Sequence, residues 1–240
     1  MKILAIIPAR GGSKSIPSKN IQKLGSLPLV AHTIKSAKES KLVNRIIVST
    51  DNRKIAEAAK KYGADIPFIR PKRFAQDSSS TLDVVKHALQ ALQKLEGYTP
   101  DIVTVLLPTT PFRHPTVIDD SVRLLKRTNA TSVISVHKTR THPFKAFMPK
   151  NGFLEPFKRD YLKYYQRQKL PDFYHTTGAA YTFWYDILEK YGNYYGPRIK
   201  PLVSHTDEMN IDLDFVFDFF VAEMTLKYWK KYPKKFRRIV

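Results

Sequence analysis

The stretch KILAIIPARGGSKSIPSKN, Lys2 to Asn20, joins a short apolar run to a loop rich in glycine and cations. The run Lys2–Ile7 is rich in isoleucine, which predicts a buried strand. Gly11 and Gly12 allow a ligand to approach the backbone closely, and successive amides beside cations hold phosphate oxygens well. The stretch therefore predicts an α/β protein whose first loop binds an anion at the carboxyl end of the first strand.

On either side of this loop, short runs rich in Ile and Val alternate with amphipathic helical patterns. Strands are predicted at Lys2–Ile7, Arg45–Ser49, Ile66–Ile69, Ile102–Leu107 and Ser132–Val136, and helices at Leu29–Ser40, Arg53–Tyr62, Thr81–Leu95 and Thr116–Arg127. Asp51 stands where an N-cap would open the second helix, and Ser80 or Thr81 stands before the third. This βαβα alternation predicts a mainly parallel sheet that is covered by helices on both faces.

From about residue 139 to residue 175 the alternation stops, and the chain is rich in proline, aromatic residues and cations. Asn151-Gly152 is typical of a hairpin turn. We predict a single domain over residues 1–240, with residues 139–175 as an inserted arm that packs on a second subunit in a homodimer or covers the site as a lid. Beyond the arm, the pattern predicts strands at Gly178–Phe183 and Ile199–Val203 and a closing helix at Asp214–Tyr228.

The composition excludes several classes of protein. The 240 residues contain no cysteine, which rules out disulfides, iron–sulfur clusters, thiolate zinc sites and cysteine nucleophiles. No run approaches the roughly 18 consecutive apolar residues of a membrane span, so we predict no span and a cytoplasmic location.

The formal net charge of +20 indicates a polyanionic partner: nucleic acid, a membrane surface, or small phosphorylated or carboxylated substrates. Residues 1–61 hold 13 Lys/Arg against three acids, and residues 227–240 hold seven Lys/Arg against none. The basic tail interleaves aromatic residues with cations, which suits either a nucleic-acid or membrane contact or a solvated helix end. The solvated end is the favoured interpretation.

The cations of the first loop suit a triphosphate. Arg10, Lys14 and Lys19 supply charge-assisted donors, which bind phosphate oxygens strongly. The loop is not a Walker A motif, because Gly11-Gly12-Ser13-Lys14 does not supply the pattern of a glycine, four residues and then Gly-Lys-Ser/Thr, and it lacks the third glycine of a dinucleotide fingerprint. A solvated glycine-rich turn is the alternative, and anion binding is favoured over it.

IIPARGGSKSIPSKNI, Ile6 to Ile21, resembles the signature of the acylneuraminate cytidylyltransferase family. Further similar fragments follow in order along nearly the whole chain: IIVSTD at Ile46–Asp51, IRP at Ile69–Pro71, QDSSST at Gln76–Thr81, LPTTPFR at Leu107–Arg113, HPFK at His142–Lys145, RQKLP at Arg167–Pro171, GAAY at Gly178–Tyr181 and NIDLD at Asn210–Asp214. Their number and order make the resemblance specific.

The resemblance implies a seven-stranded, three-layer Rossmann-like nucleotidyltransferase fold. It also implies an enzyme that transfers CMP from CTP to the anomeric hydroxyl of an acidic 2-keto-3-deoxy sugar, sialic acid or a related nonulosonic acid, and releases pyrophosphate. By similarity, the nucleotide contacts fall on Arg10, Gly11, Gly12, Ser13, Lys14, Lys19 and Asn20 for the triphosphate and on Arg70, Ser79 and Thr81 for cytosine and ribose.

Asp212 and Asp214 form a candidate metal site. Carboxylates one residue apart point to the same face of an extended segment and could together hold Mg²⁺. The alternative is that Asp214 caps the closing helix and Asp212 pairs with a lysine. The resemblance favours the metal site and a Mg²⁺ cofactor. It places catalysis on Arg10 and Lys19 with the Asp pair, and Asp212 or a metal-bound hydroxide is the candidate general base.

On the sugar side, Arg167, Gln168 and Lys145 match family residues where a cation meets the sugar carboxylate. Other positions depart from the family: Leu107 replaces an amide, and His175 and Thr177 replace polar residues of another type. Ser15 replaces a glycine, which requires that this position avoid positive φ. The nucleotide half therefore matches the family better than the sugar half, and the identity of the acidic sugar stays open.

Two other functions compete with this one. A nucleic-acid or anionic-surface binding protein on the same fold would use the net charge and the basic tail, but a triphosphate explains many of the loop's cations, so nucleic acid is disfavoured. A nucleotidyltransferase for a neutral sugar phosphate is the other alternative, and it would leave Arg167 without a carboxylate to bind.

Overall fold

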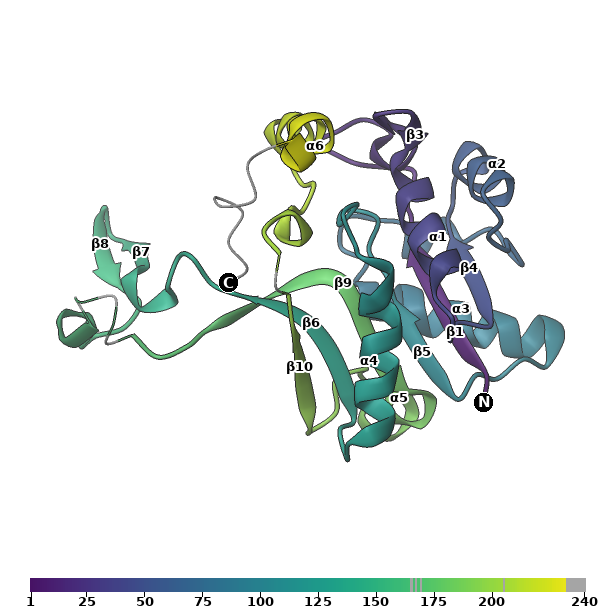
Figure 1. Cartoon of the computed structure of the whole chain (residues 1–240). Helices are drawn as coiled ribbons and strands as arrows, with labels where there is room; N and C mark the ends of the chain where they lie inside the picture. Colours follow the sequence, from purple (N-terminus) through teal and green to yellow (C-terminus); the bar gives the residue numbers. More distant parts are fainter. Residues whose placement is uncertain (165, 167, 169, 205, 232–240) are drawn as a thin grey trace.

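A six-stranded mixed sheet forms the body of the protein (Figure 1). The computed structural model describes residues 1–164, 166, 168, 170–204 and 206–231. Along the sheet the strands are β10 (Ile199–Val203), β6 (Ser132–Lys138), β9 (Tyr174–Trp184), β5 (Ile102–Val105), β1 (Ile3–Pro8) and β4 (Arg45–Ser49). β9 runs antiparallel to both neighbours, and the other pairs are parallel. The predicted mainly parallel α/β/α fold is confirmed.

Helices cover both faces of this sheet, as the alternation predicted. The α-helices of the described residues are α1 (Leu29–Glu39), α2 (Arg53–Lys61), α3 (Thr81–Glu96), α4 (Pro115–Arg127), α5 (Tyr185–Tyr191) and α6 (Val216–Tyr228), of which α6 lies at the end of the sheet rather than on a face. Alternate residues of β1 point to opposite faces. Ala5 and Ile7 pack with α1, α2 and α4, whereas Leu4 and Ile6 pack with α3. The buried central strand therefore needs the continuous apolar run that its sequence shows.

Two details differ from the sequence predictions. Ile66–Ile69 forms no strand. The chain makes an isolated β-bridge to Ile47 at Asp65, and Pro67, two residues later, has no N–H with which to continue the pairing. Among the described residues the main sheet therefore has six strands rather than seven. The N-cap of α2 is Asn52, not Asp51, because the Asn52 side chain accepts hydrogen bonds from two amides of the first turn.

The N-terminus of α3 is capped as predicted. Ser80 Oγ accepts a hydrogen bond from the Asp83 amide, and the Asp83 carboxylate accepts one from the Ser80 amide, which makes a complete capping box. This cap fixes the end of the loop that runs from the short 3₁₀ turn Lys72–Phe74 to α3. That loop faces the first loop of the chain.

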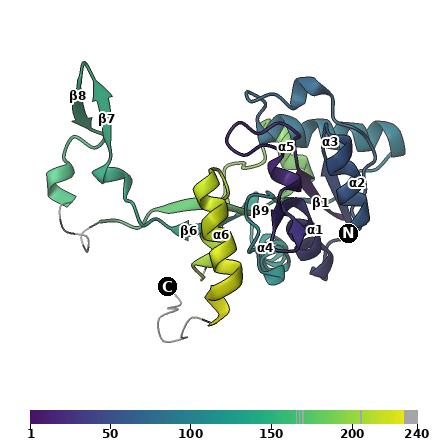
Figure 2. The same ribbon diagram turned by 90° about the horizontal axis from the view of Figure 1, so that it is seen from above.

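The segment between β6 and β9 stands out from the body as an arm (Figures 1 and 2). Its tip is a hairpin of β7 (Phe147–Lys150) and β8 (Phe153–Pro156), joined by Asn151 and Gly152, which both have positive φ. The predicted hairpin turn is confirmed. Its base is held by packed rings of His142, Phe144 and Phe173.

Helix α6 lies above the carboxyl end of the sheet, beside the small hairpin of β2 (Lys23–Leu24) and β3 (Leu27–Pro28) (Figure 1). Its buried residues Phe219 and Ala222 pack against Leu24, Leu29 and Leu213. Asp214 does not cap this helix; instead Asp218 accepts hydrogen bonds from the amides of residues 214 and 215. This turn leaves the Asp214 carboxylate available to the neighbouring cavity.

Candidate active site

A cavity of about 460 Å³ lies where β1 and β5 end at their carboxyl termini. This is the edge at which α/β sheets place their ligands. Its walls come from the first loop, the loop before α3, residues 107–109 and the segment before α6. Ten predicted residues line it: Arg10, Gly12, Ser13, Lys14, Lys19, Asn20, Arg70, Ser79, Thr81 and Asp214. Tertiary folding thus brings together residues that are up to 204 positions apart, from Arg10 to Asp214 (214 − 10).

The first loop is held in shape by contacts to its own ends and to the turn that follows β4. The buried Asn20 donates from Nδ2 to the Arg10 carbonyl at 2.9 Å, and the Gly11 amide donates to Asp51 Oδ1 at 2.8 Å. A Cβ on Gly11 would lie 2.9 Å from the Asn52 side chain, whereas one on Gly12 would meet nothing within 4 Å. Gly11 is therefore required by the fold, and Gly12 leaves the cavity open for a ligand.

Ser15, which replaces a glycine of the family pattern, does not have the positive φ that would favour glycine. Among the described residues, only Ser18 and Asn151 are non-glycine positions with positive φ, so Ser15 has an ordinary backbone conformation. The departure from the family pattern therefore leaves the loop unstrained at this point.

Arg70 is buried beside the cavity and is only 3% exposed. Its Nη2 lies 3.7 Å from Asp51 Oδ1, and neither Nε nor Nη2 has a hydrogen-bond partner within the described part of the chain. Burial is the main factor that lowers the pKa of this guanidinium. Buried donors without partners are costly, and a polar ligand in the adjoining cavity would satisfy them.

Asp77 joins the two cations nearest the mouth of the loop. Its carboxylate lies 2.9 Å from Arg10 Nη2 and 2.8 Å from Lys14 Nζ. Hydrogen bonding to Lys14, with the further charge of Arg10, lowers the pKa of Asp77. Asp77 is not among the residues predicted for the site, although it lies in the QDSSST fragment, and Asp51 is predicted only as a helix cap.

Lys19 connects the first loop to the segment that holds the two aspartates. Its Nζ donates to the Leu213 carbonyl at 2.6 Å and lies 3.4 Å from Asp214 Oδ1. Asp212 lies on the same short extended segment. Its partial withdrawal from water, opposed by a hydrogen bond from Thr109, raises the pKa of its carboxyl, and the charge of Asp214 adds to the rise.

Asp212 and Asp214 are suitable ligands for a hard divalent cation. Their mutual repulsion disfavours ionisation of Asp212, and a bound cation would relieve it. Mg²⁺ is typically bound by one or two carboxylates, and water and substrate phosphates fill its remaining coordination positions. Within the described residues, no cluster of three or more His, Asp or Glu side chains offers a closed metal site. The donor set therefore fits a cation that is completed by a ligand.

The structure does not bring the predicted sugar-side residues into the cavity. Lys145 and Gln168 lie on the arm, which extends away from the body, and both are exposed (Figure 2). Arg167 lies outside the described residues. His175 is exposed and its ring lies 6.0 Å from that of His137, nearly parallel to it. Thr177 is buried, and its hydroxyl donates to Ser135 Oγ at 2.7 Å. These predicted sugar contacts therefore stay predictions.

A buried arginine shapes the wall of the cavity at Leu107. Arg113, 4% exposed, donates to the carbonyls of Leu107 and Ala179, and Thr110 Oγ1 donates to the Thr177 carbonyl. Gly178 has φ +74°, and a Cβ there would lie 3.0 Å from both Leu107 Cδ1 and Thr110 Oγ1. The PTTPFR loop is thus fixed on the middle of β9, and the residue before it, Leu107, presents an apolar side chain to the cavity.

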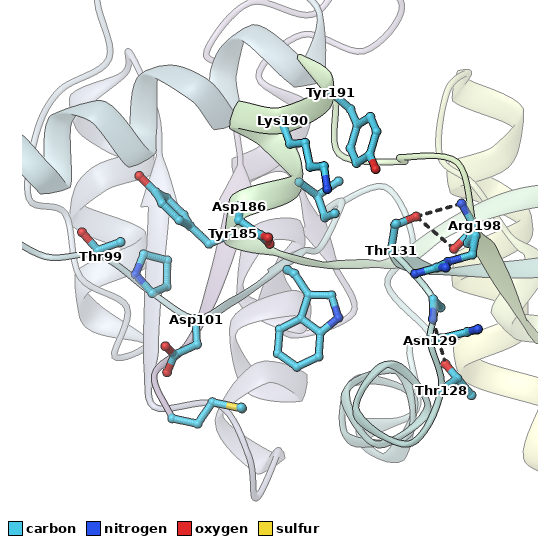
Figure 3. Close-up of a pocket in the computed structure, with 15 residues that line it drawn as sticks. Thr99, Asp101, Thr128, Asn129, Thr131, Tyr185, Asp186, Lys190, Tyr191 and Arg198 are labelled. Atoms are coloured by element: carbon cyan, nitrogen blue, oxygen red, sulfur yellow. Dashed lines mark hydrogen bonds between the residues drawn. The ribbon is translucent and has the colours of Figure 1, made fainter.

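A second cavity, of about 710 Å³, lies at the opposite end of the sheet, where β5 and β6 begin. Figure 3 shows Asp186 and Lys190 of α5 on one side, with Thr131 hydrogen-bonded to the backbone of Arg198 on the other. It is larger than the first cavity. None of the predicted site residues within the described part of the chain lines it, so we place the active site at the carboxyl edge.

Fold and cavity together define a nucleotide-binding α/β protein with a cation-lined loop after its first strand. Residues 4–231 match the family described as Cytidylyltransferase. The chain belongs to the cytidylyltransferase family, and the resemblance seen in its sequence is confirmed.

Its relatives include enzymes for several nonulosonic acids. The chain is 33% identical to the CMP-N,N'-diacetyllegionaminic acid synthase of Legionella pneumophila, over 95% of this chain and 97% of that one. It is also 33% identical to the N-acylneuraminate cytidylyltransferase of Escherichia coli, over 92% of this chain and 51% of that one. CMP:2-keto-3-deoxy-manno-octonic acid synthetase, solved with CTP, shares the fold with a TM-score of 0.68, 16% identity and coverage of 95% and 99%.

Proposed function

We propose that this protein activates an acidic 2-keto-3-deoxy sugar by transferring CMP from CTP to its anomeric hydroxyl, with release of pyrophosphate. The observation that carries this proposal is the cavity after β1, where Arg10, Lys14 and Lys19 converge beside the partnerless donors of Arg70. Family membership and relatives named for legionaminic and neuraminic acids support the same chemistry.

Different residues of the cavity would bind different parts of the nucleotide. Arg10 and Lys14, with the amides around Gly12, would bind the triphosphate, where the negative charge of the leaving pyrophosphate grows. Arg70, Ser79 and Thr81 line the wall next to the triphosphate cations and would bind cytosine and ribose. Two anions must meet for the reaction to occur, and a share of the net charge of +20 offsets their repulsion here.

Asp212 and Asp214 would hold a Mg²⁺ ion, which would neutralise phosphate charge and orient the nucleotide. Lys19, bonded to the Leu213 carbonyl, keeps the segment that bears both aspartates against the first loop. The raised pKa of Asp212 also makes it the better candidate of the two for accepting the proton of the sugar hydroxyl.

A homodimer would complete the sugar side of the site. The arm carries exposed apolar side chains at Phe153 and Leu154, and α6 exposes Phe217 and Phe220 while it buries Phe219. A helix that is apolar on both faces normally has both faces covered. Lys145 does not line the cavity of its own chain, and it lies on the arm that stands out from the body (Figure 2). A second copy would allow an arm to bring a cation to the sugar carboxylate.

The relatives suggest a nonulosonic acid such as a legionaminic or neuraminic acid as the acceptor. Leu107 lines the cavity where the family commonly has an amide, so an apolar contact replaces a hydrogen bond at that wall. We place the reaction in the cytoplasm, where CTP is available. In the described residues, no helix is long and apolar enough to cross a membrane.

The direct test is a pyrophosphate-release assay with CTP, Mg²⁺ and a panel of 2-keto-3-deoxy sugar acids, with each product identified by mass spectrometry. We expect a CMP-sugar with at least one acid and at least tenfold slower release when CTP is replaced by ATP, GTP or UTP. A mock preparation from cells that do not express the protein controls for contaminating activity. Absence of release with every acid, or release equal to that of the mock preparation, would refute the proposal.

A further inference from the structure

The two cations at the mouth of the cavity are occupied by the protein's own backbone and carboxylate. Asp77 Oδ1 lies 2.9 Å from Arg10 Nη2, and Asp77 Oδ2 lies 2.8 Å from Lys14 Nζ. Arg10 Nη1 also donates to the Gln76 carbonyl at 3.0 Å. One carboxylate thus bridges, with its two oxygens, the two side chains best placed to bind neighbouring phosphate oxygens.

Asp77 is presented by a built turn. Ser79 Oγ accepts a hydrogen bond from the Gln76 amide at 3.1 Å and donates to the Arg73 carbonyl at 3.1 Å. The capping box at Ser80 fixes the chain directly after this turn. The carboxylate is half-exposed, at 48% of its side-chain surface, and lines the same cavity as both cations. It is therefore held in the cavity and is still accessible to a competing anion.

We propose that Asp77 is an internal competitor of the triphosphate, a residue that sets how tightly the site holds CTP and pyrophosphate. The inference rests on the proposed function only in taking Arg10 and Lys14 as phosphate ligands. A nucleotide triphosphate must exchange with Asp77 for both cations, and the carboxylate regains them when pyrophosphate leaves. Asp77 thus weakens binding of the substrate and favours release of the charged product.

The lowered pKa of Asp77 is consistent with this role, because the carboxylate then stays ionised to a lower pH than an ordinary aspartate does. The competing possibility is that Asp77 turns toward a cation on the nucleotide and strengthens binding. The two roles predict opposite effects when the charge is removed, so a single substitution separates them.

The test is calorimetric titration of wild-type protein and Asp77→Asn with inorganic tripolyphosphate, CTP with Mg²⁺, and pyrophosphate. Asparagine keeps the size of the side chain and removes its charge. Two exposed ion pairs of this kind predict a gain of about 2- to 10-fold in affinity for all three anions in the variant. Pyrophosphate should also inhibit turnover of the variant at correspondingly lower concentrations.

Asp65→Asn is the matched control. Asp65 is also an exposed carboxylate, and it pairs with an arginine, Arg45, at 3.0 Å, outside the cavity. Its substitution should leave all three affinities within about 1.5-fold of wild type. Thermal unfolding of both variants checks that each is folded.

Equal or weaker binding of tripolyphosphate by Asp77→Asn would overturn the proposal, and weaker binding of CTP with Mg²⁺ would assign Asp77 to the cation instead. The two levels of inference fail separately. If CTP binds to neither protein while tripolyphosphate binds more tightly to the variant, the competitor role stands and the proposed function falls. If turnover is established and Asp77→Asn leaves the affinities for all three anions unchanged, the proposed function stands and the competitor role falls.

Discussion

The cavity and the arm of this protein are built in different ways. In the cavity, site side chains are held by each other and by the sheet: Asn20 holds the Arg10 carbonyl, and Asp51 holds the Gly11 amide. On the arm, Lys145 is exposed on a segment that stands away from the body. The cavity proposed for the nucleotide is therefore pre-formed in a single chain, whereas the arm residues proposed for the sugar would need a further element to meet it.

The difference has a physical origin. A triphosphate site needs fixed donors around concentrated charge, and these are most easily fixed at the edge of a buried parallel sheet. An acceptor site that differs among relatives can be formed by residues of a loop or of a second subunit, because such segments can change without disturbing the core. Each of the following predictions tests one side of this contrast.

The largest effect is expected from Arg10→Ala, in the pre-formed half. Loss of one fixed donor to developing charge lowers kcat/KM for CTP by about 10²- to 10³-fold. Initial rates of pyrophosphate release measure it. Arg123→Ala, which removes a surface arginine paired with Asp120, is the control and should stay within about twofold of wild type. An Arg10→Ala enzyme within threefold of wild type would remove Arg10 from the site.

An intermediate effect is expected from Lys145→Ala, on the arm. Loss of a cation facing the sugar carboxylate should raise the KM for the sugar by about tenfold and leave the KM for CTP within about twofold. Lys150→Ala is the control, since Lys150 lies on the same arm but pairs with Glu155. Equal changes in both KM values would contradict the contrast between the two halves.

Mixing the two variants sharpens this test. If a partner's arm completes each cavity, a mixed dimer of Arg10→Ala and Lys145→Ala has one site with both residues intact. Random exchange should then restore about one quarter of wild-type activity from two impaired preparations. Activity equal to the mean of the separate variants would show that each arm serves its own chain or neither.

The smallest effect concerns pH and Asp212. Because its pKa is raised in the folded protein, Asp212 becomes protonated at a higher pH than an ordinary aspartate, for which the pKa is about 3.9. As pH decreases, affinity for Mg²⁺ should therefore begin to fall at a higher pH than it would with an ordinary aspartate. Asp212→Asn should remove this part of the pH dependence. The Mg²⁺ dependence of the rate across pH measures it, with Asp120→Asn as a control.

The same shift has a consequence for stability. A carboxyl whose pKa is raised in the folded state binds its proton more tightly there than in the unfolded state, so the stability that it contributes falls as pH rises from the unfolded pKa through the folded pKa. Asp212→Asn should thus slightly raise the melting temperature at neutral pH while it impairs turnover. A lower melting temperature would indicate that the Asp212 charge is stabilised by the fold.

Much of this protein was predictable from local pattern. The buried strands, the hairpin turn at Asn151-Gly152 and the cap at Ser80 follow from residue types at fixed spacings. The strand predicted at Ile66–Ile69 does not form. A short apolar run predicts a strand whether or not a neighbouring strand is available to pair with it, so local pattern alone cannot decide such a case. Asp77 escaped prediction because an exposed carboxylate carries no local signal of the cations it meets.

The sequence by itself determined the order of strands and helices, the first loop and the family, because each rests on patterns within short segments. Only the tertiary structure decided which residues meet: that Arg70 is buried with donors that no described residue bonds, that Asp77 bridges Arg10 and Lys14, and that Lys145 does not line its own cavity. Contacts across long stretches of chain depend on packing of the whole sheet, and local propensity does not encode that packing.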